Sequence, residues 1–143
     1  MTGPAKAALA ALGLIAFALI VTSGAARADN FDALRTDAEI ENGVLIVAIG
    51  DIMRDNCPGF ELRRVPAAAF FWGLVDRARA LGYSTDEIRA YVDNDADVER
   101  VQARARLWLQ QQGADLSVPE TICEIARDEI SNDTVIGRLI REG

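Results

Sequence analysis

The chain has 143 residues and a formal net charge of −7, from 15 basic and 22 acidic side chains. This length allows one domain with a modest hydrophobic core. The acidic balance disfavours nucleic acid and anionic lipid surfaces as partners, because both attract positive charge.

The first 28 residues have the pattern of a cleaved signal peptide. Lys6 gives a positive start, Ala7–Val21 is an unbroken apolar segment, and Ala26–Ala28 is a small-x-small cleavage site. The apolar segment has about 15 residues, fewer than the roughly 20 that cross a bilayer. We therefore expect export to the periplasm, a mature chain that begins at Asp29, and no membrane span after cleavage.

Cleavage would remove Lys6 and Arg27 and no acid, which changes the net charge from −7 to −9 and leaves a chain without Lys or His. This composition excludes a Ser–His triad, a Ser–Lys dyad and a Schiff base. Carboxylate chemistry of the glycosidase kind remains, with Glu124, Asp128 and Glu129 as candidates. Because exposed helices ordinarily carry such acids, we expect a protein that is not an enzyme.

Cys57 and Cys123 are the two cysteines of the chain. In an exported protein an even pair predicts one disulfide. The loop that it closes, from residue 57 to residue 123, would contribute roughly 4 kcal/mol in the chain-entropy model. The alternative, two free buried thiols, fits an oxidising compartment less well.

A long apolar segment that ends at Cys57 organises the chain. Thr36–Asn56 has helical periodicity, and Val44–Ile49 is apolar all round, which predicts a central buried helix. The preceding residues, Asp29–Asp37, are polar and predict an irregular arm or a frayed first turn. The sequence Cys-Pro-Gly then ends the helix.

Further amphipathic helices follow, each with one apolar face. They are predicted over Pro66–Leu81, from a capping box at Ser84–Glu87, over Asp97–Gln112, over Pro119–Ile130 after a second capping box at Ser117–Glu120, and over Val135–Ile140. No strand is predicted. The fold class is therefore all-α, a compact bundle of about five helices with one disulfide, Cys57–Cys123, in a single domain over residues 29–143.

The apolar helix faces also predict which large side chains are buried, among them Phe71, Val92 and Val98. Trp72 lies beside its stripe, so we expect it to be half exposed. A tryptophan of this kind, joined to other apolar side chains, marks a partner surface. The candidate partner surface consists of Phe60, Trp72, Ile136 and Ile140.

An acidic cluster, Asp93, Asp95 and Asp97, alternates acids in the manner of a calcium loop. The EF-hand pattern needs Gly at its sixth position and Glu at its twelfth, where this chain has Val98 and Arg104. We interpret the cluster as the start of a helix, with a weak cation site as the alternative. Since the mature chain lacks His and both cysteines are expected to be bonded, no metal centre, haem or other cofactor is expected.

Several landmarks occur together in this chain. They are the secretory signal, the apolar helix ending in Cys57-Pro58, the helix start at Gly82-Tyr83-Ser84, Pro119-Glu120 before Cys123, and the ending Ile136–Arg141. On these landmarks the chain resembles a family of small periplasmic proteins of alphaproteobacteria known as a domain of unknown function. The resemblance implies no activity and no binding residues. Genes of that family sometimes lie among those of the respiratory NADH–quinone oxidoreductase, which implies a membrane-complex context.

The sequence leaves three hypotheses for function. The first, which we favour, is a non-enzymatic periplasmic interaction or assembly protein that docks onto another periplasmic or membrane protein. The second is an acid-stress chaperone, because at low pH the acids lose their charge while the arginines keep theirs. The third is a carboxylate-dependent hydrolase of cell-wall glycan.

Overall fold

The computed structural model describes residues 30–143 and shows an almost wholly helical protein. In this part of the chain the helices are α1 (Asp32–Thr36), α2 (Ala38–Asn56), α3 (Arg64–Ala80), α4 (Thr85–Val92), α5 (Asp95–Gln111), α6 (Pro119–Ser131) and α7 (Val135–Leu139). The strands are β1 (Phe60–Leu62) and β2 (Ile140–Glu142). The predicted all-α class is confirmed, and no helix within these residues is long and apolar enough to cross a membrane. The predicted signal peptide, residues 1–28, lies outside the described residues.

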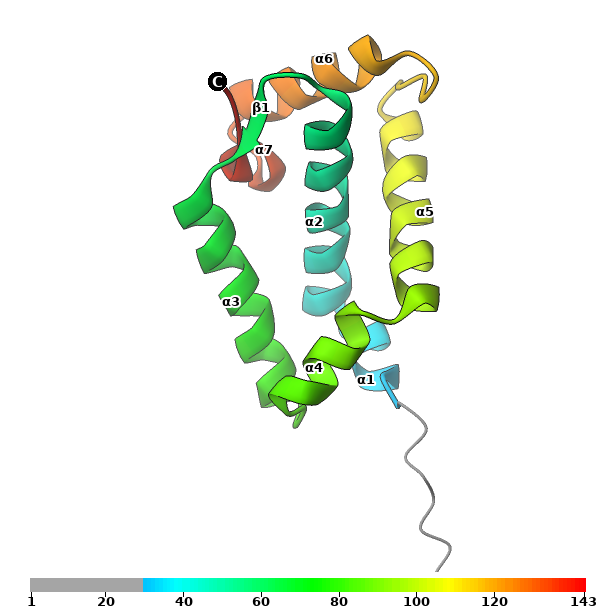
Figure 1. Ribbon diagram of the computed structural model, residues 1–143, viewed down its shortest axis with the longest axis vertical. Coiled ribbons are helices and arrows are strands. Elements are labelled where there is room, and N and C mark those ends of the chain that lie inside the picture. The colour runs from blue at the N-terminus through cyan, green and yellow to red at the C-terminus, as the bar shows by residue number, and fades with distance from the viewer. Residues whose placement is uncertain (1–29) are drawn as a thin grey trace, which may run out of the picture.

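α2 stands at the centre of the molecule (Figure 1). It contacts α1, α3, α5, α6, α7 and β1. α5 runs along one side of it, α3 is splayed out on the other, and α6 crosses its carboxyl-terminal end. Ile49 and Met53 of α2 are 1% and 0% exposed. The predicted central helix is therefore present.

The helix predicted over Thr36–Asn56 is interrupted at Asp37, where the backbone is extended. The Asp37 carboxylate accepts hydrogen bonds from the amides of Glu39 and Ile40, both at 3.1 Å. These bonds satisfy amides that the first turn of a helix leaves without partners. α2 therefore begins at its own cap instead of continuing from the turn before it.

The irregular arm or frayed first turn predicted over Asp29–Asp37 is wrong for the described residues, because Asp32–Thr36 forms the separate, packed helix α1. Phe31 and Leu34 are 2% and 1% exposed and belong to a second core cluster that includes Tyr91. The rings of Phe31 and Tyr91 meet edge to face with centroids 5.4 Å apart. Burial of these two large apolar side chains is enough to hold a helical turn that is otherwise exposed or half-buried.

The predicted disulfide is confirmed. Cys57 directly follows the last residue of α2 and Cys123 lies in α6, with Cα atoms 5.5 Å apart. Both cysteines are buried in the main core cluster with Leu109 and Ile122. The bond therefore fixes α6 across the end of α2.

Of the two predicted capping boxes, one is present. At Ser84 the hydroxyl and the Glu87 carboxylate cap each other's backbone amides. The second box is wrong, because α6 begins after Val118 with no side-chain cap. Val118 and not Ser117 occupies the cap position, and the Ser117 hydroxyl donates to the Asp115 carboxylate at 2.6 Å.

The chain ends in a strand that the sequence pattern does not predict. β2 pairs antiparallel with β1, with Phe60 opposite Glu142 and Leu62 opposite Ile140. Strands of three residues are too short for an alternating pattern to identify them. This small sheet closes the chain over the disulfide end of the core.

Two helical glycines should respond in opposite ways to alanine. At Gly137 in α7, a Cβ would collide with the backbone carbonyl of Glu129 in α6. Overpacking of this kind costs about 1–3 kcal/mol, so Gly137→Ala should lower the free energy of unfolding. At Gly73 in α3, a Cβ would meet no atom within 4 Å. Gly73→Ala should therefore raise the free energy of unfolding, by about 0.5–1 kcal/mol.

Urea unfolding of the two glycine variants beside the parent protein measures both changes. Gly73→Ala is the control for the general effect of alanine in a helix. Equal stabilisation by both substitutions would contradict the close packing of α7 on α6.

Candidate functional site

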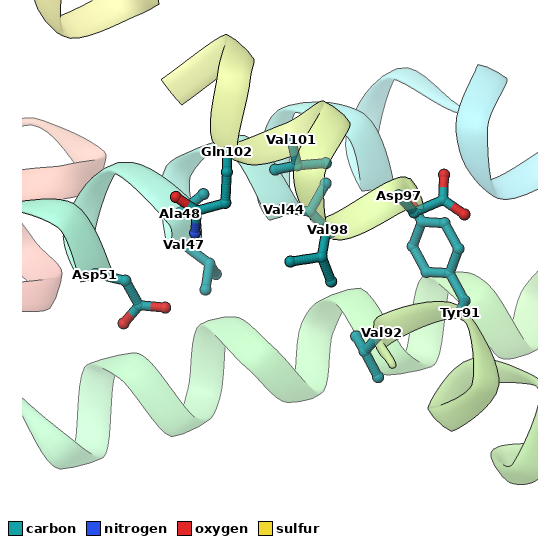
Figure 2. Close-up of a pocket in the computed structure, with 10 residues that line it drawn as sticks. All are labelled: Val44, Val47, Ala48, Asp51, Tyr91, Val92, Asp97, Val98, Val101 and Gln102. Carbon is teal, nitrogen blue, oxygen red and sulfur yellow. The ribbon is translucent and has the colours of Figure 1, made fainter. Parts of the chain in front are cut away.

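An uncovered apolar region lies on one face of α2, where two hollows meet. The first, of about 220 Å³, is bounded by α2, α4 and α5 (Figure 2). The second, of about 190 Å³, is bounded by α2, α3, α7 and β1. Val47 and Asp51, one helical turn apart on α2, line both hollows. We call the two hollows together the trough.

Large apolar side chains that solvent reaches surround the trough. Val47 is 38% exposed, while Phe71 on α3, Val92 on α4 and Val98 on α5 are each 45% exposed. The prediction that Phe71, Val92 and Val98 are buried is therefore wrong. Their helices present them toward the trough as the sequence pattern indicates, but no element among residues 30–143 covers them.

The trough exists because α2 is apolar all round over Val44–Ile49 and its neighbours leave one side of this segment open. Within Val44–Ile49, Ala48 and Ile49 are buried, whereas Val44 is half-buried and Val47 is exposed. α3 approaches α2 closely at Gly43, where Leu74 occupies the space that a Cβ would need. From there α3 leans away toward β1 (Figure 1).

Asp51 places a carboxylate between the two hollows, at one end of the row of side chains in Figure 2. Burial raises the pKa of Asp51 above its ordinary value, and Arg54, with Nη1 3.1 Å from Oδ1, partly opposes that rise. The Asp51 side chain is 37% exposed, so a group that enters the trough can reach it. The trough is therefore suited to a ligand that is mostly apolar and carries a positive charge.

At the other end of the trough lies Asp97, a residue in the first turn of α5 that is 4% exposed. Its two carboxylate oxygens accept hydrogen bonds from Nε and Nη2 of Arg35 at 2.9 and 2.8 Å. Arg100 donates a third bond at 3.3 Å. The bonded Arg35 guanidinium holds the pKa of Asp97 below its ordinary value.

The weak cation site considered for the acidic cluster is not formed. Asp97 is committed to Arg35 and Arg100, while Asp93 and Asp95 are exposed. No group of three or more His, Cys, Asp or Glu side chains within residues 30–143 is arranged to hold a metal ion. Of the acids interpreted as capping and starting a helix, Asp95 and Asp97 lie in the first turn of α5, whereas the cap is Asn94, whose Oδ1 accepts a hydrogen bond from the amide of Asp97.

Two further carboxylates join helices at the amino-terminal end of α2. Glu41 accepts from Nη1 and Nη2 of Arg100 at 2.7 and 2.8 Å and also from Arg104. Asp37 accepts from Nε of Arg77 in α3 at 3.0 Å, and the bonded guanidinium lowers the pKa of Asp37. These pairs hold α3 and α5 to one end of α2, so the trough opens between helices whose positions are fixed.

The four residues of the candidate partner surface do not form one exposed surface in the structure. Trp72 is 55% exposed, as predicted. The prediction is wrong for Phe60, Ile136 and Ile140, which are 5%, 6% and 1% exposed. They belong to the main core cluster, because β1, α7 and β2 pack together against α2. The surplus of apolar residues at Val44–Ile49 is the sequence signal that points to the trough instead.

The acids considered for glycan hydrolysis lie along α6. Glu124 and Asp128 are exposed, and Glu129 accepts a hydrogen bond from the Thr134 hydroxyl. None of these three side chains lines a hollow described here.

A family model described as a family of unknown function, DUF5333, matches residues 32–141. No curated protein and no solved structure matches the chain. The matched residues run from α1 into β2, so they include the disulfide and every element that bounds the trough.

Asp51→Asn should stabilise the protein at neutral pH. Burial raises the folded-state pKa of Asp51, so its charged form costs free energy above that pKa, and the cost disappears as the pH falls below the unfolded value of about 3.9. The variant should unfold at higher urea than the parent at about pH 7 and at the same urea at about pH 3. Asp76→Asn is the matched control, because Asp76 is 74% exposed on α3 and is likewise paired with an arginine three residues further along, Arg79. An Asp51→Asn variant less stable than the parent at neutral pH would contradict the cost that partial burial places on the charged carboxylate.

Proposed function

We propose that this chain, which belongs to the DUF5333 family, is a non-enzymatic binding protein whose trough receives an apolar helical segment of another protein. The observation that carries the proposal is the incomplete cover of α2. Val47, Phe71, Val92 and Val98 are each more than one-third exposed around the trough. Scattered single apolar side chains are normal on a surface, whereas a contiguous group marks an interaction site.

The shape of the trough favours a helical segment. α2 forms its floor, α3 and α5 stand on either side, and α4 lies across one end (Figure 1). A fourth helix laid between α3 and α5 would cover Val47 in the way that helices cover one another in a bundle. The occupant would carry apolar side chains at helical spacing and one basic residue to meet Asp51.

We propose the periplasm as the compartment in which this binding takes place. Two observations support it: the Cys57–Cys123 disulfide, which is stable under oxidising conditions, and the signal-like pattern of residues 1–28. The proposed partner is a periplasmic or membrane protein. A membrane respiratory complex is one such partner, on the gene context of the family that the sequence resembles.

A photo-crosslinking residue at Val98 should capture the partner in the native host. Val98 is 45% exposed at the trough. Leu107 is 53% exposed on the same helix, nine residues further along and therefore on the opposite side. We expect an adduct of defined mass from position 98, none from position 107, and loss of the adduct when Asp51→Arg is added to the variant at position 98. Adducts of equal yield from both positions, or recovery of the protein alone from both, would overturn the proposal.

A second candidate function, an acid-activated chaperone, is favoured by the ion pairs of Asp37 and Asp97. Bonded arginines lower the pKa of both carboxyls. The stability that these groups contribute is therefore present above the unfolded pKa of about 3.9 and is lost as the pH falls through their folded pKa. Since Asp37 holds α3 and Asp97 holds α1, protonation loosens the helices and exposes apolar surface.

This second candidate predicts that the protein suppresses aggregation of an acid-unfolded client at about pH 2–3 and not at neutral pH. Light scattering of the client, with and without the protein, measures the suppression. Asp97→Asn removes the charge that Arg35 binds, so this variant should act at a higher pH than the parent. A protein that stays compact in acid and leaves the client aggregating excludes this function.

A further inference from the structure

The outward side of α3 is apolar although no element among residues 30–143 covers it. Val65 is 81% exposed and Trp72 is 55% exposed. Ala68 and Ala69, which lie between them, are also exposed. These four positions have the spacing i, i+3, i+4, i+7 that places side chains on one side of a helix. We call them the outer stripe.

The outer stripe and the trough use different sides of α3. Ala67 and Phe71 line the trough, whereas none of the hollows described here is lined by a residue of the outer stripe. The Phe71 and Trp72 rings meet edge to face at the border, with centroids 5.5 Å apart. The outer stripe is thus the convex surface of a helix. Such a surface encloses no small ligand but fits against an extended one.

α3 is also the most basic helix within the described residues of this acidic protein. It carries Arg64, Arg77 and Arg79 against the single carboxylate of Asp76, whereas α2 and α6 each carry four carboxylates and one arginine. Arg63 directly precedes the helix and is exposed. Arg64 is exposed and makes no ion pair or side-chain hydrogen bond within residues 30–143. Arg77 and Arg79, near the carboxyl end of α3, are paired with Asp37 and Asp76. The positive charge of α3 that no carboxylate within residues 30–143 offsets therefore lies at the end of the outer stripe where Val65 lies.

From this combination we propose that the outer stripe docks on an anionic lipid surface, with α3 lying parallel to that surface. Val65 and the two alanines enter the boundary between headgroups and acyl chains, as the apolar side of an interfacial helix does. Trp72 suits the same depth, because its ring is apolar and its N–H is polar. Arg63 and Arg64 pair with lipid phosphates.

The net charge of the chain does not prevent this contact. At physiological ionic strength, screening limits the reach of exposed charges to about 8 Å, so distant acids count for little. The nearby acids Asp76 and Glu61 are paired with Arg79 at 3.3 Å and with Arg141 at 2.7 Å. The expectation that anionic lipid is disfavoured rests on the average charge, and α3 departs from that average. An acidic protein surface is the other partner class with this charge, and vesicles that contain no protein distinguish the two.

Co-sedimentation of the full chain, produced by export, with phosphatidylcholine vesicles containing a minor fraction of phosphatidylglycerol tests the proposal. We expect the protein to sediment with these vesicles, not with pure phosphatidylcholine, and less as salt is raised. The double variant Arg63→Gln, Arg64→Gln should weaken binding about 30-fold, from about 1 kcal/mol per arginine. Trp72→Ala should weaken it about tenfold through the loss of apolar contact.

Leu107→Ala and Arg89→Gln are the matched controls, at positions 53% and 69% exposed on α5 and α4. Both should bind as the parent does. All variants share one amino terminus, defined by mass spectrometry, so any contribution of the leading segment is common to them. Far-ultraviolet circular dichroism and thermal melting establish that each variant is folded. Absence of the parent from the anionic vesicles, as an acidic protein partner would give, overturns the proposal, and so do equal losses in the stripe variants and the controls.

Discussion

Between Val44 and Ile49, α2 is apolar on every side, and such a helix is stable in water only where other elements cover it. α5 packs along one side, while α6 and α7 pack on another. The disulfide at Cys57 holds α6 in that position, at the end of α2 where the chain leaves the helix. This cover is incomplete, since Val47 stays 38% exposed. The neighbouring helices that form the core with α2 bury most of this apolar segment, and the part that they leave exposed is the trough.

At its amino-terminal end, α2 is held to its neighbours by ion pairs. Glu41 and Asp97 are largely buried carboxylates, and each needs several donors to replace the water it has lost. Arginine meets this need because its planar fork donates two parallel hydrogen bonds, as Arg35 does to Asp97 and Arg100 does to Glu41. Such pairs fix geometry more than they add stability. With a covalent bond at one end of α2 and ion pairs at the other, the walls of the trough keep their spacing without an occupant.

The features that could be predicted from the sequence are those that neighbouring residues decide. The cap at Ser84 and the central helix are of this kind, and the disulfide follows from a pair of cysteines. The role of Asp97 could not be predicted, because it depends on Arg35, 62 residues away. Periodicity identifies the apolar side of a helix, but it does not say whether another element lies against that side. For this reason the sequence pattern predicts that Phe71, Val92 and Val98 are buried, whereas the structure leaves them exposed.

α3 presents a second uncovered apolar surface. A helix that is apolar on both sides is ordinarily a buried one, yet Val75 and Ala78 are the buried residues among its 17. The inner side of α3 does not lie flat on α2. Near the carboxyl end of α3, Leu74 packs closely against Gly43 of α2, whereas near its amino end α7 and β1 lie between the two helices. Its outer side has no neighbour within the described residues. Since the two sides face different directions, a contact made by the outer stripe leaves the trough open. The contact proposed for the outer stripe and the contact proposed for the trough therefore do not exclude each other.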